Sequence, residues 1–313
     1  MAARQQHYLD IDGRQVSVSN PDKPMYPSGF TKGQAIDYYI RAADYLLPHI
    51  RSHPITLKRY PDGISAPHFY EKDAPRFTPA WVERFAVPRR NGGKDIQYVL
   101  LNGLASLVWA ANLANLEIHP FLAAAPDIER PVSVVFDLDP GPGTDVLTCI
   151  EVAFLLKNKL ANRGLELCAK VSGSKGMQVY VPLNSKVTYP ESQMFARTVA
   201  EEMEREQPGL IVSEMAKAAR GGKVFVDWSQ NSDFKTTVAV YSLRAKHDQP
   251  FVSLPFSWEE LDHAHKKHDS SMLFVQPEQA IERLNKVGDL FAPMLTLRQR
   301  LTMPKRARKS GSS

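Results

Sequence analysis

The chain is organised around the stretch VSVVFDLDPGPG, residues 132–143. Its apolar first half predicts a short buried strand, and the prolines and glycines from Pro140 onwards predict a turn that ends the strand. Because strand side chains alternate, Asp137 and Asp139 point to the same face, about 6 to 7 Å apart. Two carboxylates this close repel each other unless a cation offsets them, so the motif predicts a site for a divalent metal ion. An aspartate-rich turn that caps the next helix is the alternative.

The composition is that of a globular protein. The 313 residues are 43% hydrophobic and 23% charged, which is enough for a buried core in one large domain or two. No apolar run approaches the about 20 residues of a membrane span, and the N-terminus lacks the apolar segment of a signal peptide, which predicts a cytoplasmic protein. Cys149 and Cys168 lack metal-ligand spacing and are expected as buried thiols. The net charge of +5 permits an anionic partner such as nucleic acid.

The N-terminal segment predicts a hairpin and then a helix. Two alternating runs flank Asp12 and Gly13, which is typical of a β-hairpin. From Thr31, a candidate N-cap, apolar residues recur at helical spacing as far as Ile50. Lys32 lies in the first turn, where the helix dipole disfavours a cation. A solvated surface lysine is the alternative to a functional one.

The segment ITLKRYPDGISAPHFYEKDAP, residues 55–75, alternates basic and aromatic residues. Lys58, Arg59 and Phe69 could line a groove in which rings stack on bases and cations meet phosphates. A half-buried pair of strands is the alternative. An ATP-dependent ligase would carry a lysine where Tyr60 stands in YPDG, so no adenylated lysine is predicted.

A histidine of interest follows the next predicted elements. Residues 95–101 predict a strand, and Asn102 is the expected cap of a helix that includes Leu116. His119 comes after this helix. A lone histidine is more often structural than catalytic, but this one precedes the strand of Asp137 by a single connection and is therefore a candidate to face the same cleft.

Two later stretches supply further charged residues. SGSKG, residues 172–176, joins two predicted strands, and its small residues with Lys175 could bind an anion through backbone N–H groups; a plain hairpin turn is the alternative. KVFVDWS, residues 223–229, predicts a strand that carries Asp227, the third carboxylate that a two-metal site needs. A cap is the more ordinary role for such an aspartate.

Basic residues surround this third carboxylate. Arg220 belongs to a glycine-bearing basic loop before it, and Lys235 and Arg244 are expected on the strand that follows. Helices are predicted over residues 145–163, 189–206 and 277–287.

Four motifs together resemble a known family. VVFDLDPG, VSGSKGMQVYVPL, KVFVDWSQN and KTTVAVYSLR, in this order and spacing, resemble the polymerase domain of bacterial ligase D, in the archaeo-eukaryotic primase superfamily. The resemblance runs from about residue 20 to residue 300. The expected fold is α/β (α+β), with a mixed, mostly antiparallel catalytic sheet flanked by helices and an N-terminal segment packed on it. Residues 1–300 are expected to form one cooperative unit with an N-terminal subregion of about 1–125, and residues 301–313 a disordered basic tail.

The resemblance also implies a function. It implies a nucleotidyltransferase that adds nucleotides, preferably ribonucleotides, to DNA 3′ ends during double-strand-break repair by end joining. The implied cofactors are two Mn²⁺ or Mg²⁺ ions per site. The implied partners are nucleoside triphosphates, DNA ends with a 5′-phosphate, a Ku-like end-binding protein and an ATP-dependent DNA ligase, fused or separate, near the nucleoid of a bacterium or archaeon and with no membrane.

Roles follow for individual residues, as implied by the resemblance. The catalytic metal ligands would be Asp137, Asp139 and Asp227. The nucleotide-binding residues would be Tyr70, His119, Ser172, Lys175, Gln178, Gln230, Lys235 and Arg244. The pocket for a DNA 5′-phosphate would be Asn20, Lys23 and Lys32, and the contacts to template or other DNA would be Lys58, Arg59, Phe69 and Arg220.

One position of the chain departs from the sequence pattern of the family. The family has a histidine where this chain has Gln178. A glutamine amide is only a neutral donor, which predicts weaker triphosphate binding.

Two other protein classes are alternatives to this family. A phosphatase of the haloacid dehalogenase type shares the DxD motif but expects Gly-Thr after it, where this chain has Pro140 and Gly141. A non-catalytic DNA-end-binding homologue is the other alternative, and the three intact aspartates argue against it. Without a ligase or nuclease module, the chain is expected to be a free-standing polymerase or a domain of a longer protein.

Overall fold

The computed structural model describes residues 6–183 and 185–301. The strands, in chain order, are β1 (Gln6–Ile11), β2 (Arg14–Ser19), β3 (Pro54–Arg59), β4 (Phe69–Glu71), β5 (Arg84–Val87), β6 (Ile96–Leu100), β7 (Asn115–Pro120), β8 (Ser133–Pro140), β9 (Cys168–Val171), β10 (Met177–Pro182), β11 (Ile211–Val212), β12 (Val224–Asp227), β13 (Leu243–Arg244), β14 (Phe251–Val252) and β15 (Leu254–Pro255). The helices are α1 (Lys32–Ile50), α2 (Leu104–Asn112), α3 (Val146–Ala161), α4 (Tyr189–Glu206), α5 (Trp258–Lys267), α6 (Pro277–Val287) and α7 (Pro293–Thr296), with the 3₁₀ turns η1 (Lys217–Arg220), η2 (Trp228–Asn231) and η3 (Ser270–Leu273).

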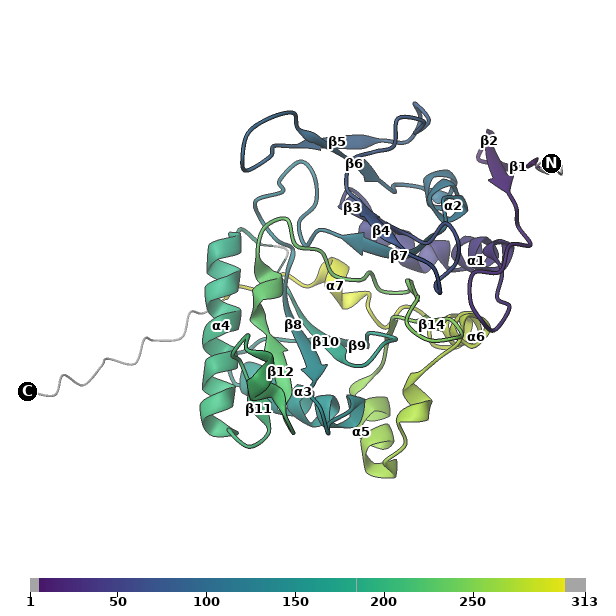
Figure 1. Ribbon diagram of the computed structural model, residues 1–313. Coiled ribbons are helices and arrows are strands. Elements are labelled where there is room, and N and C mark those ends of the chain that lie inside the picture. The colour runs from purple at the N-terminus through teal and green to yellow at the C-terminus, as the bar shows by residue number, and fades with distance from the viewer. Residues whose placement is uncertain (1–5, 184, 302–313) are drawn as a thin grey trace, which may run out of the picture.

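The central sheet has the strand order β11-β12-β8-β10-β9-β15. β11 and β12 are parallel, and the other neighbours in this sheet are antiparallel. β8 lies in the interior of this sheet, and its side chains Val134, Phe136 and Leu138 are fully buried, as expected for a strand covered on both faces. Helices α3 and α4 pack against β8, and α5 packs on α3 (Figure 1). The mixed, mostly antiparallel sheet with flanking helices confirms the predicted fold class.

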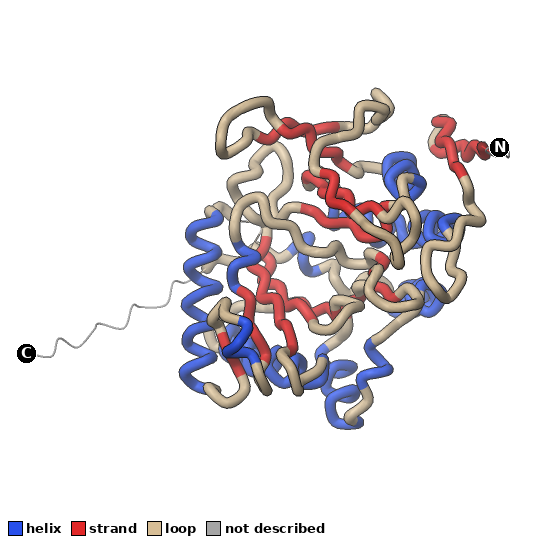
Figure 2. Tube along the Cα trace, viewed as in Figure 1, coloured by secondary structure: helices blue, strands red, loops and turns tan. Residues whose placement is uncertain are grey.

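A second sheet is built from the N-terminal part of the chain. Its strand order is β4-β3-β6-β5, and β7 also pairs with β3. Figure 2 shows its strands as a group separate from those of the central sheet. Helices α1 and α2 pack together, and α2 also contacts β7. One contiguous hydrophobic core includes residues of both layers, among them Leu57 and Phe136. Cooperative unfolding of the two sheets and their helices as one unit stays a prediction.

Several helix boundaries follow directly from local sequence. Thr31 caps α1, and its side chain accepts a hydrogen bond from the Gln34 N–H while Gln34 reaches back to the cap. Asp145 caps α3, which ends at Ala161, and Pro190 lies in the first turn of α4. The predicted N-terminal hairpin is also present, as β1 paired with β2. These elements confirm the predicted helix starts and the predicted hairpin.

Two boundaries were predicted wrongly. Asn102 is not the cap of α2; Gly103 is, and the Asn102 side chain instead accepts a hydrogen bond from the Ser52 N–H at 2.7 Å. α2 ends at Asn112, so Leu116 and His119 belong to strand β7. Between α2 and β7 the chain turns at Ala114, whose φ of 59° lies in the left-handed region.

A third expectation, of one strand carrying Lys235 and Arg244, is also wrong. Arg244 lies on the two-residue strand β13, whereas Lys235 lies in a loop. Among the described residues, no helix is both long enough and apolar enough to cross a membrane. Cys149 and Cys168 are free and buried, as expected. Apart from Leu301, the expected basic tail lies outside the described residues.

Candidate functional site

The central sheet places two of the three predicted carboxylates opposite each other. Asp137 on β8 pairs in register with Asp227 on β12, and Asp139 lies two positions further along β8, on the same face. On the other side of β8, Asp137 pairs with Gln178 on β10, and Gln178 pairs with Lys170 on β9. A single row of side chains therefore crosses four strands and brings together residues that are far apart in the sequence.

The three aspartates lie close enough that the charge of one makes ionisation of the others less favourable. Burial raises the pKa of Asp137 to about 7, and the neighbouring charges of Asp139 and Asp227 add to this effect. Burial and the charge of Asp227 also raise the pKa of Asp139, while Arg220 lowers it. Carboxylate oxygens are the ligands that Mg²⁺ and Mn²⁺ prefer, and a divalent cation would relieve this repulsion.

The aspartates thus fit a divalent ion by their chemistry and electrostatics. Within residues 6–183 and 185–301, however, no group of three or more His, Cys, Asp or Glu side chains is arranged as a ready-made metal site. The assignment of the aspartates as metal ligands therefore remains a prediction.

A cavity of about 290 Å³ opens beside the aspartates. Most of the predicted nucleotide-binding residues line it, together with two of the three aspartates. The lining from the predicted set is Asp137, Asp139, His119, Ser172, Lys175, Gln178, Gln230 and Arg244. Asp227 adjoins the cavity through Gln230, whose side-chain amide donates a hydrogen bond to it at 3.3 Å. Residues from both sheets therefore meet at one concave site.

The SGSKG turn closes one side of the cavity. The Ser172 N–H donates to the Gly176 carbonyl at 2.9 Å, so the segment is a tight hairpin turn between β9 and β10. Gly173 has a φ of +67°, and a Cβ there would lie 2.8 Å from the Arg244 side chain. A Cβ at Gly176 would collide with the Leu138 carbonyl. Glycines at these positions let the turn pack closely on β8 and Arg244, and Lys175 stays exposed.

Gln178 occupies the position of the family's histidine and is held on two sides. Its side-chain oxygen accepts a hydrogen bond from the Tyr180 hydroxyl at 3.0 Å. Because that oxygen is engaged, the amide nitrogen is the group available to Asp137, and a side-chain hydrogen bond from Gln178 lowers the pKa of this aspartate. The glutamine thus supports ionisation of Asp137 without carrying a charge itself.

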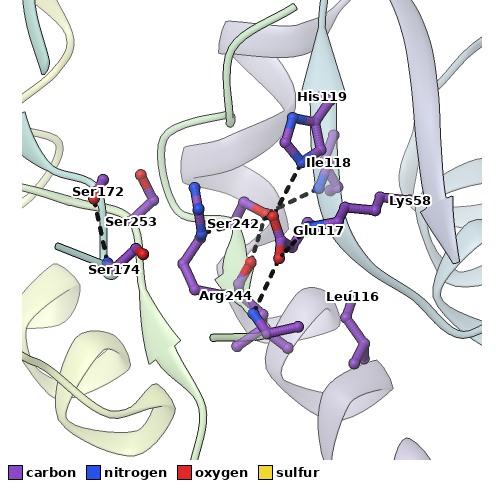
Figure 3. Close-up of polar contacts among 12 residues, drawn as sticks. Lys58, Leu116, Glu117, Ile118, His119, Ser172, Ser174, Ser242, Arg244 and Ser253 are labelled. Carbon is purple, nitrogen blue, oxygen red and sulfur yellow. Dashed lines mark hydrogen bonds and ion pairs between the residues drawn. The ribbon is translucent and has the colours of Figure 1, made fainter. Parts of the chain in front are cut away.

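The opposite side of the cavity depends on a carboxylate that no sequence motif indicated. Glu117 on β7 is fully buried, and His119 Nε2 lies 3.1 Å from its Oε2 (Figure 3). Arg244 Nε lies 3.6 Å from the same oxygen. Burial on its own would raise the pKa of Glu117, but the hydrogen bond with His119 and the nearby cations hold it well below its usual range.

Tyr70 lies at the edge of this group and is 55% exposed. Its ring meets the His119 ring edge-on, with the ring centroids 6.0 Å apart. Lys58, by contrast, is only 2% exposed and donates to Glu117 at 2.9 Å. The predicted contact of Lys58 with nucleic acid does not fit this burial, and the alternative of a half-buried strand pair describes it better.

Arg59, Phe69 and Arg220 are engaged with neighbouring groups. Arg59 pairs with Glu71 at 2.6 Å and lies over the exposed ring of Phe69. Arg220, in η1, lies 3.6 Å from the centroid of the Phe225 ring. These residues are accessible in part, and their contacts with DNA stay predictions.

Lys235 does not line the cavity. Its ammonium donates to the Ser229 hydroxyl at 2.6 Å, and it borders a second groove of about 950 Å³. The structure therefore separates Lys235 from the predicted nucleotide-binding residues that line the cavity.

The three residues predicted to bind a 5′-phosphate lie together in another part of the molecule. The Lys23 N–H donates to the Asn20 carbonyl, and the Lys32 N–H donates to the Lys23 carbonyl. The Lys32 ammonium is buried and donates to Ser19 Oγ and to Asn112 Oδ1. Burial and the charge of Lys23 lower the pKa of Lys32 to about 8. Lys32 is therefore not the solvated lysine of the alternative interpretation.

Comparison with known proteins decides the family. Residues 31–291 match the model of the LigD primase-polymerase domain. The chain belongs to the LigD primase-polymerase domain family. This is a family of metal-dependent nucleotidyltransferases, and the membership contradicts the haloacid dehalogenase alternative.

Several relatives share a large part of this domain. The multifunctional non-homologous end joining protein LigD of Mycolicibacterium smegmatis is 37% identical over 89% of the chain, and the bifunctional LigD of Bacillus subtilis is 32% identical over 74%. The polymerase domain from Mycobacterium tuberculosis ligase D, solved in complex with DNA, is 36% identical with a TM-score of 0.83, and the match covers 91% of this chain and 99% of that one. The chain spans 36% of the length of the Mycolicibacterium LigD.

Proposed function

We propose that this LigD-type domain adds nucleotides, ribonucleotides in preference, to DNA 3′ ends during end joining of double-strand breaks. The observation that carries the proposal is the register of Asp137 and Asp227 beside a cavity lined by cationic and polar residues of both sheets. A carboxylate pair attracts divalent cations, whereas the cavity's Lys175 and Arg244 attract an anion, and a metal–triphosphate complex combines both charges.

Asp137, Asp139 and Asp227 would hold two divalent ions, Mn²⁺ in preference to Mg²⁺. When bound, such ions supply Lewis-acid stabilisation of the attacking 3′-oxygen and of the departing pyrophosphate. The Gln178 amide would orient the Asp137 carboxylate and favour its ionised form.

The remaining cavity residues would bind the incoming nucleotide. Arg244 and Lys175 would contact its phosphates, and Ser172 together with the SGSKG backbone would donate further hydrogen bonds. Tyr70, exposed at the edge of the group, would stack on the base. Gln230 would hold Asp227 in place.

The turn that contains Lys23 and Lys32 would recognise the 5′-phosphate on the downstream side of a gap. This pocket supports a role at broken ends, because a terminal phosphate carries more charge than an internal diester. A Ku-like end-binding protein and an ATP-dependent ligase are the expected partners, and work on chromosomal ends would place the protein at the nucleoid.

Primer extension on gapped DNA with a 5′-phosphate tests this proposal. In Mn²⁺ the protein should extend the 3′ end, and it should use ribonucleoside triphosphates more efficiently than deoxyribonucleoside triphosphates. Binding of the DNA with no extension by either nucleotide type would instead favour the non-catalytic end-binding homologue. Equal use of both nucleotide types would contradict the ribonucleotide preference but leave the polymerase assignment standing.

A further inference from the structure

Glu117 lies at the centre of the polar network behind one wall of the cavity (Figure 3). Its carboxylate is completely buried and faces five groups from strands β3, β7 and β13 and from the residues that follow β3 and β13. Oε1 lies within hydrogen-bond distance of Lys58 Nζ, the Tyr60 hydroxyl and the Ala245 N–H. Oε2 faces His119 Nε2 and Arg244 Nε.

The two oxygens of this carboxylate serve different sets of residues. The partners of Oε1 do not line the cavity, whereas both partners of Oε2 do. Three donors therefore fix the carboxylate from behind, and its second oxygen faces His119 and Arg244. A carboxylate held in this way restricts the rotamers of the two side chains that reach the cavity.

Arg244 shows that the network is incomplete without a ligand. It is 9% exposed, and its Nε has no hydrogen-bond partner among residues 6–183 and 185–301. At 3.6 Å from Glu117 Oε2, this nitrogen forms an ion pair but not a hydrogen bond. The Glu117 ion pair therefore orients the guanidinium without satisfying it, and an anionic ligand in the cavity would supply hydrogen-bond acceptors to the guanidinium.

His119 is constrained more tightly than Arg244. Its Nε2 faces Glu117, and Nδ1 points away from that carboxylate (Figure 3). The groups that face its ring are Glu117, the cations Arg244 and Lys58, and the Tyr70 ring. Burial lowers the pKa of His119 in spite of the adjacent carboxylate. In the neutral ring Nε2 carries the hydrogen, and Nδ1 carries a lone pair that suits a hydroxyl donor such as a nucleotide's sugar.

We infer that Glu117 is a positioning residue of the nucleotide site, which holds Arg244 toward the phosphates and fixes His119 as the Nε2–H tautomer. The inference rests on the proposed nucleotide function. It predicts that removing the charge of Glu117 weakens nucleotide binding without altering the metal ligands. Glu117 itself does not line the cavity.

The test compares E117Q with E202Q. Glu202 is a matched control, because this partly buried carboxylate also holds two cations, Lys159 and Arg163, away from the cavity. Each protein is assayed for thermal unfolding, for binding of ATP with Mn²⁺ in the absence of DNA, and for primer extension. We expect E117Q to weaken ATP binding and to raise the nucleotide KM by about tenfold, with kcat changed by less than about twofold. E202Q should leave both values unchanged.

Nitrogen NMR of the histidines supplies a measurement on the unmodified protein, which decides the question even if E117Q does not fold. His119 should show the hydrogen on Nε2, and the Nδ1 signal should shift when ATP is added. Hydrogen on Nδ1, or ATP affinity in folded E117Q equal to that of the wild type, would overturn the inference. Failure of the wild type to bind any nucleotide would instead contradict the proposed function.

Discussion

Gln178 lies directly opposite Asp137 across strands β10 and β8, and its side-chain oxygen is occupied by the Tyr180 hydroxyl. The amide therefore presents its nitrogen to the aspartate. A neutral amide at this position adds no charge to the cavity, whereas a protonated histidine would.

The substitution Q178H should accordingly improve nucleotide binding. We expect the nucleotide KM to fall about threefold to tenfold, because a hydrogen bond from a charged donor is stronger than one from a neutral amide. The measurement is the KM for ATP in Mn²⁺-dependent primer extension. Y180F is the companion variant, because it frees the Gln178 oxygen. Introduced into the wild-type protein, it should raise the nucleotide KM; introduced into Q178H, it should change the nucleotide KM less. An unchanged KM in Q178H would show that glutamine serves equally well.

Tyr70 should act through its ring. Stacking of a base on an aromatic side chain contributes about 1 to 3 kcal/mol, so Y70A should raise the nucleotide KM by roughly fivefold to a hundredfold. Y70F should retain most of the affinity, since the ring remains. Phe77 is exposed to a similar extent, whereas the Tyr70 ring also packs edge-on against His119 of the cavity, so F77A is the matched control. If Y70F and Y70A were equally impaired, the hydroxyl and not the ring would be the important group.

The preference for a 5′-phosphate should depend on pH through Lys32. Its pKa is about 8, and a lysine is charged below its pKa, so the pocket is charged at pH 7 and loses charge as the pH rises. The phosphate is already a dianion across this range, because its second pKa is about 6. We expect gapped DNA with a 5′-phosphate to bind at least about tenfold more tightly than its hydroxyl counterpart at pH 7, and this ratio to fall toward one at pH 9.

Two substitutions check the same pocket. K23A and K32A should remove the preference for the phosphate but not all DNA binding, and added salt should weaken the wild type more than either variant. K286A removes an exposed lysine of α6 and should leave the preference intact. A wild-type ratio near one at pH 7, or a ratio that stays constant up to pH 9, would contradict this account.

The cysteines should be unreactive in the native protein. Both are buried, and burial raises the pKa of Cys168 to about 12 and that of Cys149 further still. Because the thiolate is the nucleophile, iodoacetamide at pH 8 should modify neither residue until denaturant is added. Mass spectrometry after a timed reaction measures this. Rapid alkylation of either thiol without denaturant would show that the surrounding core opens frequently.

Local sequence was sufficient for much of the fold. The alternation in residues 132–139 and the caps at Thr31 and Asp145 are short-range signals, and the structure follows them. The end of α2 could not be found in this way. The helix stops through a left-handed Ala114, and no glycine or proline marks that turn in the sequence. Leu116 was therefore assigned to the helix, and the strand that carries Leu116 and His119 was not predicted.

The site was predictable where the residue types are unusual and unpredictable where partners are distant. A DxD motif after an apolar strand is noticeable by itself. The role of Glu117 depends on Lys58 and Arg244, which strand pairing brings to it from other parts of the chain. Lys58 was interpreted as a surface cation for the same reason. A buried ion pair leaves no local pattern, because each member is an ordinary charged residue in its own segment.

Primer extension by D227N, beside the wild type, tests the central claim that Asp137, Asp139 and Asp227 form one catalytic site. The change is isosteric and removes one carboxylate charge from the row that crosses β12 and β8. Loss of one ligand of a two-metal site costs several kcal/mol of transition-state stabilisation, so extension in Mn²⁺ should fall by a factor of about a thousand or more. Binding to 5′-phosphorylated gapped DNA should remain within about twofold of the wild type. Extension by D227N at the wild-type rate would contradict the account.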